Sequence, residues 1–336
     1  MKGLLLAGGH GTRLRPLTFT GNKHMIPIAN KPMLFYGLEH LLKAGIKEIA
    51  IVLGPIQEGI REKIGNGKEF DGNVTYIQQP DPRGLAHTVQ LSEDFMGDEP
   101  FVMYLGDNLM MMMMIIRQGV IPLMRTFVND KSDSVICISS VGNASQYGVV
   151  EMNFSGNITR LVEKPSSSIS NLALVGVYLF NHHIFEAVRE IKPSWRNELE
   201  ITDAIQYLLQ THRRISVEKV SGWWKDTGRP SDLLDANHLV LDDLTPKIDI
   251  DLPPSCQLTG KVSISHGTTL SSNTRIRGPA IVGRNCEIGP NVYIGPYTSI
   301  GDNSKVLSGE LEGSIMMENV IIICKKRLVD STKFDY

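Results

Sequence analysis

Apolar residues along the first three-quarters of the chain occur in short runs that predict strands separated by helices. Runs rich in Leu, Ile, Val and Phe are bounded by Gly, Asp, Asn or Pro, which is typical of buried strands. Residues 32–44 have helical periodicity, with Pro32 at the start and Gly45 just after the end. Alternating strands and helices favour a mostly parallel sheet covered by helices. The strands predicted here are residues 2–6, 46–53, 74–78, 101–105 and 135–139.

Further along, the same patterns predict an added mixed-sheet region. Its strands are expected at residues 157–162, 172–180 and 215–220, and two helices at 198–211 and 231–241. We therefore expect an α/β domain over residues 1–244.

After residue 244 the pattern changes to one aliphatic residue at every sixth position. A hexapeptide repeat with Gly, Asn, Ser and Thr between the aliphatic residues is the signature of a parallel β-helix. We therefore predict a second domain over residues 245–336, with an irregular C-terminal cap because the repeat is lost near Leu311. Such a domain usually packs or assembles. The repeating residues are Leu258, Ile264, Leu270, Ile276, Val282, Ile288, Ile294, Ile300 and Val306.

Composition restricts the classes of function. The 336 residues fit two domains, and Lys+Arg 34 against Asp+Glu 36 gives a net charge of −2. That balance argues against nucleic acid as a partner and requires phosphate chemistry to rely on local basic residues. The first apolar run is too short for a signal peptide, and no 18-residue apolar stretch occurs. We expect a cytoplasmic protein with no membrane partner, whose four scattered cysteines are free thiols.

A glycine-rich loop follows the first predicted strand, in the sequence LAGGHGTRL. Its glycines, Gly8, Gly9 and Gly11, let the backbone pass close to a ligand and direct N–H groups at phosphate oxygens. A helix starting after them would add its positive end. The spacing matches neither GxxxxGK[ST] nor GxGxxG. Arg13, in the loop, and Lys23 supply two cations that can neutralise a triphosphate as charge moves onto its leaving group.

The stretch that contains this loop resembles the signature of the sugar nucleotidyltransferase family, in particular its long-form glucose-1-phosphate thymidylyltransferases. Its sequence is LLLAGGHGTRLRPLTFTGNKHMIPIANKPM. Further matches follow in order along nearly the whole chain: PRGLAH, LGDN, YGVV, EKP, ELEITD and WKDTG. The resemblance implies a Rossmann-like, GT-A-like mixed sheet with helices on both faces, followed by a small left-handed parallel β-helix. It also implies transfer of dTMP from dTTP to glucose 1-phosphate, with release of pyrophosphate, and a homo-oligomer.

Two aspartates are the predicted metal ligands. Asp107 ends an apolar strand at the edge where open α/β sheets bind ligands, and Asp226 lies in the later loop WWKDTG. Mg²⁺ binds through one or two carboxylates together with substrate phosphates, and the resemblance implies this pairing. A sugar phosphate is already ionised at neutral pH, so we expect no general base. Positioning and charge neutralisation dominate such transfers.

The acceptor phosphate needs its own cations, and the resemblance assigns these to Lys164 and Arg196. Glu163 is expected to accept hydrogen bonds from sugar hydroxyls. The resemblance further places Gly148, the backbone around Leu174 and the nearby Tyr178 at the sugar pocket.

Base recognition is assigned to Gln79, Gly84 and the glycines of the first loop, with Thr12 also at the nucleotide. An amide side chain can donate and accept, which matches a pyrimidine edge. Thymine and uracil differ by one methyl group, which an apolar pocket discriminates by only about 1–3 kcal/mol. UTP therefore stays an alternative to dTTP.

Three alternative functions remain open, and two segments are not explained by the family pattern. The chain could be a UTP-using uridylyltransferase, a non-catalytic subunit that senses sugar nucleotides, or an enzyme whose β-helix also transfers acyl groups. His266, in the repeat region, is read as a turn residue and not as a base. The run Met110–Met114 follows the GDN motif where a glycine is usual, and the tail 315–326 fits either a last coil or an assembly contact.

Overall fold

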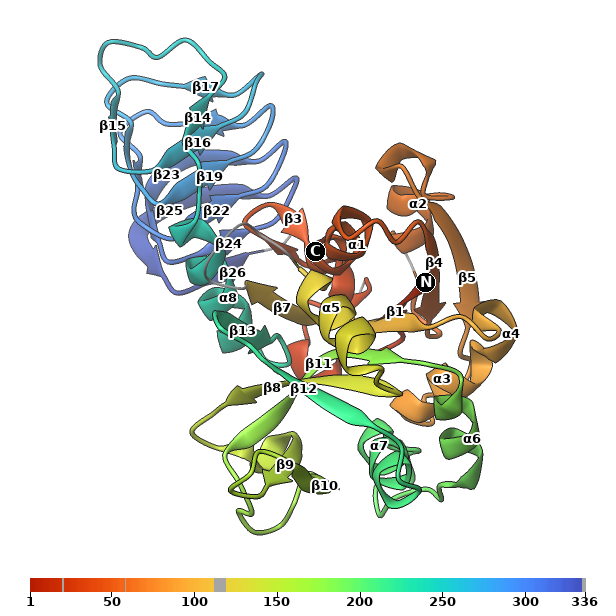
Figure 1. Cartoon of the computed structure of the whole chain (residues 1–336). Coiled ribbons are helices and arrows are strands. Elements are labelled where there is room, and N and C mark those ends of the chain that lie inside the picture. Colours follow the sequence, from red (N-terminus) through yellow and green to blue (C-terminus); the bar gives the residue numbers. More distant parts are fainter. Residues whose placement is uncertain (20, 58, 112–118, 334–336) are drawn as a thin grey trace. The chain divides into compact units, whose positions relative to one another are not determined.

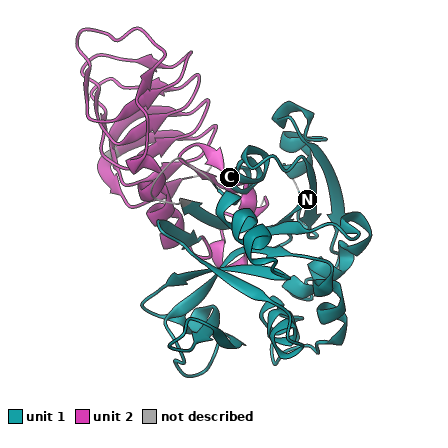
Figure 2. Cartoon of the chain, in the orientation of Figure 1, with its two compact units in different colours: residues 1–10, 34–226 teal, residues 11–33, 227–336 magenta. Residues whose placement is uncertain are grey.

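The computed structural model describes residues 1–19, 21–57, 59–111 and 119–333, and these fall into two compact units (Figures 1 and 2). Unit 1 comprises Met1–His10 and Leu34–Asp226, and unit 2 comprises Gly11–Met33 and Thr227–Tyr336. The glycine-rich loop thus passes from one unit into the other between His10 and Gly11. The division into domains at residue 244 stays a prediction.

Unit 1 is built on a mixed sheet, to which the described residues contribute nine strands, with the order β10-β9-β11-β6-β1-β4-β5 and with β8 and β12 joined through β11. Its centre is parallel, because β1 pairs with both β4 and β6, and β4 pairs with β5. β11 is antiparallel to its neighbours β6, β8 and β9. The bounds are β1 Lys2–Ala7, β4 Glu48–Leu53, β5 Asn73–Gln78, β6 Phe101–Leu105, β8 Ser134–Ser140, β9 Gly148–Met152, β10 Ile158–Glu163, β11 Leu172–Phe180 and β12 Ile215–Lys219.

Helices cover both faces of this sheet (Figure 1). Alternate strand residues such as Leu4 and Met103 pack into one core with α3, α6 and α7. On the other face, Gly37 of α1 lies against Leu5 and Tyr104, and α5 packs on β8 and β12. The bounds are α1 Met33–Lys43, α2 Ile60–Ile64, α3 Leu85–Leu91, α4 Glu93–Met96, α5 Ile121–Asp130, α6 His183–Glu190 and α7 Ile201–Gln210. The predicted α/β fold with helices on both faces is confirmed.

A two-stranded ribbon lies outside the main sheet. β7, Asn108–Met111, pairs antiparallel with β13, Trp223–Asp226. The pattern did not predict it, because both strands are four residues long and pair across more than a hundred residues of sequence. Of the methionine run, Met110 and Met111 belong to β7, and the remainder falls in residues 112–118, outside the described residues.

Unit 2 contains α8, Pro230–Asp242, the small hairpin β2–β3 and the predicted left-handed parallel β-helix. Ile264, Val282 and Ile300 are in register on three neighbouring strands, so one coil takes eighteen residues, or three hexapeptides. The inward aliphatic residues form the core. The strands are β14 Lys247–Ile248, β15 Gln257–Thr259, β16 Val262–Ile264, β17 Thr269–Leu270, β18 Arg275–Arg277, β19 Ala280–Val282, β20 Glu287–Ile288, β21 Tyr293–Ile294, β22 Thr298–Ile300, β23 Lys305–Glu312, β24 Ile315–Met316, β25 Ile321–Val329 and β26 Thr332–Lys333.

The parallel pairing continues beyond Leu311, where an irregular remainder was expected. β25 pairs in parallel with β23, and β26 with β24. The hexapeptide register is lost because the interval between buried residues shortens to five, from Val306 to Leu311 and from Leu311 to Met316. The tail therefore continues the β-helix, as the first of the two alternatives for residues 315–326 proposed.

The edges of several elements differ from the predicted ones. α7 begins at Ile201, not at 198, because the preceding residues are held in a loop by bonds such as Leu199 N–H to the Arg83 carbonyl, 2.8 Å. The helices α3, α5 and α6 and strand β9 were not predicted from the pattern. Among the described residues, no helix is long and apolar enough to cross a membrane.

Candidate active site

Three predicted ligand-binding residues of unit 1 lie where parallel strands end. Gly8 follows β1, Gln79 follows β5 and Asp107 follows β6 by two residues. Since β1, β4, β5 and β6 run in the same direction, their carboxyl ends meet at one edge of the sheet, where open α/β folds bind ligands.

Gln79 is held so that its oxygen faces the glycine-rich loop. Its Nε2 donates to the Gly84 carbonyl at 3.3 Å and lies 3.1 Å from His87 Nδ1. A Cβ on Gly8 would lie 3.1 Å from Gln79 Oε1. Burial lowers the pKa of His87, as does Arg83, whereas Asp81 opposes the shift. A neutral His87 can accept from Gln79, so both amide hydrogens are engaged and Oε1 remains as an acceptor.

Gly84 has a conformational role inside the protein. Its φ is +100°, and a Cβ there would lie 2.4 Å from the Leu199 carbonyl oxygen. Ala86 N–H donates to that same oxygen at 2.9 Å. The predicted nucleotide loop is therefore attached to the 194–200 loop, which carries Arg196.

Of the two predicted metal ligands, Asp226 ends strand β13 of the ribbon and Asp107 directly precedes strand β7. Asp226 is the register partner of Asn108, which directly follows Asp107. Asn108 is 4% exposed, and its Nδ2 donates to Asp107 Oδ1 at 3.1 Å. Its Oδ1 accepts from Gly176 N–H at 3.1 Å and from Trp224 Nε1 at 2.6 Å. Asn108 thus orients the Asp107 carboxylate and attaches the ribbon to β11.

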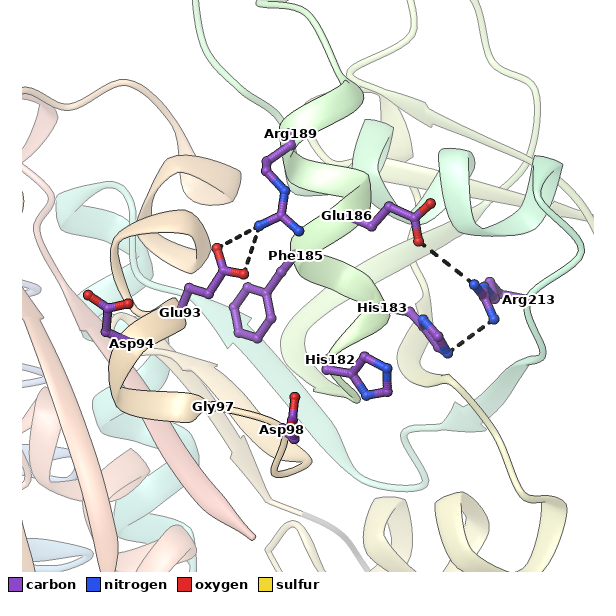
Figure 3. Close-up of a pocket in the computed structure, with 10 residues that line it drawn as sticks. All are labelled: Glu93, Asp94, Gly97, Asp98, His182, His183, Phe185, Glu186, Arg189 and Arg213. Carbon is purple, nitrogen blue, oxygen red and sulfur yellow. Dashed lines mark hydrogen bonds and ion pairs between the residues drawn. The ribbon is translucent and has the colours of Figure 1, made fainter.

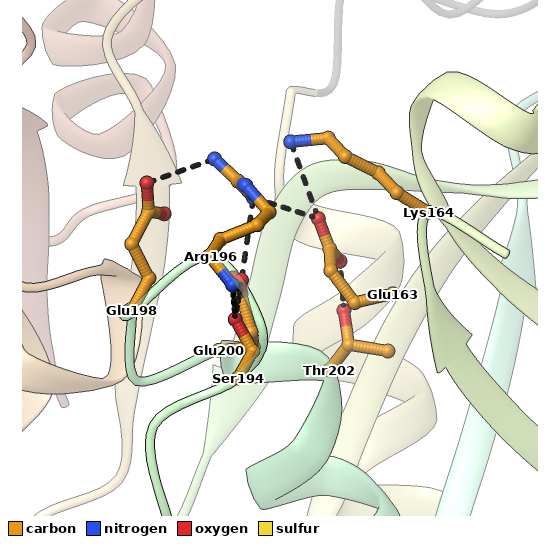
Figure 4. A network of polar contacts seen from close by, with 7 residues as sticks. All are labelled: Glu163, Lys164, Ser194, Arg196, Glu198, Glu200 and Thr202. Carbon is orange, nitrogen blue, oxygen red and sulfur yellow. Dashed lines mark hydrogen bonds and ion pairs between the residues drawn. The ribbon is translucent and has the colours of Figure 1, made fainter. Parts of the chain in front are cut away.

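The predicted sugar-phosphate residues gather in one polar network (Figure 4). Glu163 Oε1 lies 3.5 Å from Lys164 Nζ and 3.6 Å from Arg196 Nη1. Its other oxygen accepts from Thr202 Oγ1 at 2.6 Å. In unit 1, therefore, the fold brings the adjacent residues Glu163 and Lys164 together with Arg196 from a second, later segment.

Arg196 lies among carboxylates in this network (Figure 4). Besides Glu163, it pairs with Glu198 at 2.9 Å and with Glu200 at 3.3 Å. Burial is the largest cause that raises the pKa of Glu200, and the charges of Glu163 and Glu198 add to it, whereas Ser194 and Arg196 oppose the rise. The guanidinium is thereby fixed in place before any anion arrives.

Gly148 lies directly against this network. It is the register partner of Glu163, and a Cβ on it would lie 2.6 Å from Thr202 Oγ1 and 2.8 Å from Leu174 Cδ1. Leu174 is 5% exposed and Tyr178 3% exposed. Burial raises the pKa of the Tyr178 hydroxyl, and the charge of Glu163 adds to the shift. Position 148 requires a glycine because Thr202 and Leu174 approach it too closely to leave space for a Cβ.

The remaining predicted residues lie in unit 2, apart from the exposed Gly9 in unit 1. Thr12 and Arg13 form a single 3-10 turn, Thr12–Leu14, where a longer helix was considered. A turn of this length adds little dipole. Arg13 Nη2 lies 2.9 Å from the position of a Cβ on Gly228. A Cβ on Gly11, which has φ +63°, would lie 2.9 Å from Lys23 Cβ.

Several supporting residues were missed from the sequence. Asn108 and Thr202 were part of quoted motifs, but nothing in the sequence indicates which neighbours they bond. Gly54 could have been found, since it follows the apolar strand β4. A Cβ on it would lie 2.3 Å from the Gly8 carbonyl oxygen.

A separate cavity of about 720 Å³ in unit 1 contains none of the predicted residues (Figure 3). Among the residues that line it, Arg189 pairs with Glu93 at 2.7 Å and Arg213 with Glu186 at 3.7 Å. Within the described residues, no group of three or more His, Cys, Asp or Glu is arranged to hold a metal. A metal site in unit 1 would therefore depend on two carboxylates.

Comparison with known proteins points to one family. The sequence profile of the nucleotidyl transferase family matches residues 2–243. A glucose-1-phosphate thymidylyltransferase from Streptomyces antibioticus is 43% identical over 332 residues, which cover 98% of this chain and 91% of that protein.

Solved structures give the same result. A crystal structure of a candidate glucose-1-phosphate thymidylyltransferase from Bacillus anthracis, in complex with sucrose, aligns with TM-score 0.66 and 33% identity, over 75% of this chain and 97% of that one. A UDP-glucose pyrophosphorylase complexed with UDP-glucose also aligns with TM-score 0.66, at 29% identity, over 72% of this chain and 98% of that one.

Proposed function

Because the chain belongs to the nucleotidyl transferase family and is a nucleotidyltransferase, we propose that it transfers dTMP from dTTP to glucose 1-phosphate, giving dTDP-glucose and pyrophosphate. The 43% identity to a glucose-1-phosphate thymidylyltransferase over almost the whole chain supports this choice of substrates.

The observation that carries the proposal is the strand register that pairs Asp226 with Asn108, the residue directly after Asp107, together with the hydrogen bond from Asn108 Nδ2 to the Asp107 carboxylate. This arrangement fits a cation that must bind substrate phosphates as well as protein. Nucleotidyltransferases of this family generally use a divalent metal ion. The donor set consists of two carboxylates without sulfur or imidazole, which suits the hard cation Mg²⁺. Asp107 and Asp226 would hold the ion, which supplies positive charge against the phosphate oxygens.

The reaction is attack by a phosphate oxygen of the sugar phosphate on the α-phosphorus, with pyrophosphate leaving in line. The attacking oxygen is already ionised, so the chain needs cations and positioning and not a general base. Arg13 and Lys23 bind the triphosphate and neutralise the leaving pyrophosphate, assisted by backbone N–H groups from Gly8 to Thr12. Lys164 and Arg196 bind the acceptor phosphate.

Sugar and base contacts follow from the same geometry. Glu163, held by Thr202, accepts hydrogen bonds from sugar hydroxyls at a pocket formed with Gly148, Leu174 and the buried Tyr178. Gln79, beside Gly84, offers only Oε1, which accepts from the N3–H of thymine or uracil and repels the N3 lone pair of cytosine.

The test is a substrate panel that crosses dTTP, UTP, CTP and ATP with several sugar 1-phosphates, with pyrophosphate release as the readout. We expect dTTP with glucose 1-phosphate to give the highest kcat/KM, UTP to follow within about tenfold to two-hundredfold, and CTP to be poor. Equal use of CTP would contradict the role of Gln79. Turnover of no pair, at saturating Mg²⁺, would leave the non-catalytic sensing subunit as the better description.

The uridylyltransferase alternative keeps specific support. The structural match to a UDP-glucose pyrophosphorylase is as good, by TM-score, as the match to the thymidylyltransferase-like protein. The panel decides between them by the order of dTTP and UTP. The acyl-transfer alternative has less support, because His266 is exposed in a β-helix turn.

We further propose a homo-oligomer in the cytoplasm. Ile321 and Ile323 are 61% and 74% exposed on β25, and within the described residues this strand pairs only with β23. An apolar strand with one open edge favours association between chains. The four cysteines, which form no disulfide, suit a reducing compartment.

A further inference from the structure

The segment Gly11–Met33 carries Arg13 and Lys23, and its first part is folded back on itself around Gly11. Thr18 Oγ1 donates to the Gly11 carbonyl at 2.8 Å, and the space beside Gly11 is filled by Thr18 and Lys23. The buried Asn22 accepts from His24 N–H at 2.9 Å and starts the 3-10 turn Lys23–Met25. The two cations therefore lie on one compact loop, and a displacement of that loop displaces both.

This loop leads directly into a hairpin whose tip is tightly bent. β2, Pro27–Ile28, pairs with β3, Lys31–Pro32, so that only Ala29 and Asn30 connect them. Both have left-handed backbone angles, φ 46° and 63°. An alanine in this region is unfavourable unless the surroundings hold it there.

The hairpin tip is held by α8 and the β-helix. Ala29 N–H donates to Asn237 Oδ1 at 2.9 Å, and Asn30 Nδ2 donates to the Ile300 carbonyl at 2.6 Å. Asn237 lies on α8, and Ile300 lies on β22. Both contacts lie within unit 2. The β-helix and the segment Gly11–Met33, which carries Arg13 and Lys23, therefore pack together as one body.

Asn237 uses both the oxygen and the nitrogen of its side-chain amide in this contact. It is fully buried, its Oδ1 also accepts from Ser299 Oγ at 3.0 Å, and its Nδ2 donates to the Tyr297 carbonyl at 3.0 Å. One side chain thus joins three segments: the hairpin tip, α8 and the coil 297–300. Aspartate has the same shape but lacks the donor, and alanine lacks both functions.

We propose that Asn237 is a positioning residue for nucleotidyl transfer, and that through it the β-helix sets the position of the loop that carries Arg13 and Lys23. The inference rests on the proposed function, which makes these two cations phosphate ligands. It changes the role of the repeat domain from an assembly module to a support for the nucleotide site.

The test compares Asn237→Ala with Thr268→Val in the full-length chain. Thr268 is the control, because its buried hydroxyl makes two hydrogen bonds, with the Gly283 carbonyl at 2.7 Å and Cys286 N–H at 2.9 Å, but it contacts a different coil. Both variants should lower the melting temperature, and Asn237→Ala by more, because Asn237 makes three hydrogen bonds. Only Asn237→Ala should reduce kcat/KM for dTTP, by at least about tenfold, since a misplacement near 1 Å can cost about a hundredfold. KM for glucose 1-phosphate should stay unchanged in both variants.

A second variant, Asn30→Gly, keeps the left-handed backbone and removes only the bond to Ile300. Because the Ile300 carbonyl still accepts from Gly283 N–H at 2.8 Å, no buried acceptor is left unpaired. Asn30→Gly should also reduce kcat/KM for dTTP, but by a smaller factor than Asn237→Ala does. If Asn237→Ala fails to fold, Asn30→Gly alone tests the proposal. Normal kcat/KM in a well-folded Asn237→Ala, or in Asn30→Gly when only that variant folds, would overturn the proposal.

Amide hydrogen exchange separates this inference from the proposed function. Exchange at the amides of residues 28–31 should become faster in Asn237→Ala and stay unchanged in Thr268→Val, whether or not the chain turns over any substrate. If the wild type is inactive while exchange responds in this way, the proposed function fails and binding of Mg-dTTP becomes the readout for the loop. Unchanged exchange in Asn237→Ala would contradict the positioning role itself.

Discussion

At the scale of single residues, the orientation of the Asp107 carboxylate depends on Asn108, which is itself held by bonds to other strands. Asp107, Asp226, Glu163 and Arg196 were selected because their residue types suit metal and phosphate binding. Their supporting neighbours could not be predicted. Asn108 bonds Gly176 and Trp224, which lie 68 and 116 residues away along the chain. Such pairs depend on strand register across the fold, which no local pattern contains.

Replacing Asp107 by Asn tests the metal site. The substitution keeps the size of the side chain, so the fold should be unchanged. Because it removes a negative charge from the donor pair, kcat/KM should fall on the order of a hundredfold at limiting Mg²⁺ and recover in part as Mg²⁺ is raised. Pyrophosphate release over a Mg²⁺ titration measures this. Asp98→Asn, on an exposed carboxylate in the separate cavity, is the control. Near-normal activity of Asp107→Asn at limiting Mg²⁺ would refute the assignment.

Protonation of His87 should weaken nucleotide binding. Its pKa is lowered in the folded chain, so it is neutral at pH 7, and the stability it contributes is present above its ordinary pKa of 6.5 and lost as pH falls through the lowered value. A protonated ring cannot accept from Gln79 Nε2. Loss of that bond should raise KM for dTTP by about two- to tenfold as the pH falls through this lowered pKa.

The variant His87→Gln isolates this effect from titration of the substrate phosphates. Its amide oxygen can still accept, but it does not titrate. KM for dTTP should therefore change less between pH 7.5 and pH 5 in the variant than in the wild type. Parallel pH profiles would show that His87 is not the titrating group.

At the scale of elements, pattern predicted the buried strands and missed the short ones. β1, β6 and β11 were found because each is a continuous apolar run on both faces of the sheet. The ribbon β7–β13 contains the predicted metal ligand Asp226 and begins directly after the other, Asp107, yet its four-residue strands resemble loops in sequence. α7 began late because bonds between loops, such as Leu199 with Arg83, compete with the helix. Elements that depend on distant partners are the ones a linear pattern cannot show.

The contact between Gly84 and Leu199 should be sensitive to one methyl group. In Gly84→Ala the new Cβ meets a backbone oxygen and must also adopt φ +100°, so we expect a loss of roughly 2–4 kcal/mol in the free energy of unfolding. Denaturant unfolding measures it. Gly97→Ala is the matched control, because Gly97 has φ +57° and open space around it. Equal losses in the two variants would show that the backbone angle alone sets the cost.

At the scale of the whole molecule, the sequence predicted both architectures, since the change of period near residue 244 is sharp. The sequence could not show that the segment Gly11–Met33, which follows soon after strand β1 along the chain, packs with the β-helix in unit 2. From sequence, we expected a chain truncated after Leu244 to keep its chemistry. The bonds of Asn237 and Asn30 to residues 297–300 change this expectation.

A chain that ends after Leu244 should now lose nucleotide affinity. It would lack the acceptors at Tyr297 and Ile300, so the hairpin tip would be held from one side only. We expect KM for dTTP to rise by at least about tenfold while the secondary structure of unit 1, followed by circular dichroism, persists. A folded truncation with an unchanged KM for dTTP would restore the original expectation.

The coil length of eighteen residues limits how this protein can change in size. Adding or deleting one complete coil leaves every strand above its former partner and each aliphatic side chain in the interior. Adding a single hexapeptide also keeps the interior apolar, but it advances the chain by a third of a turn and moves every later residue to another face of the prism. If such a change preceded residue 297, a different face would meet α8. In lineages that keep the Asn237 contact, length differences ahead of that coil should therefore come in multiples of eighteen.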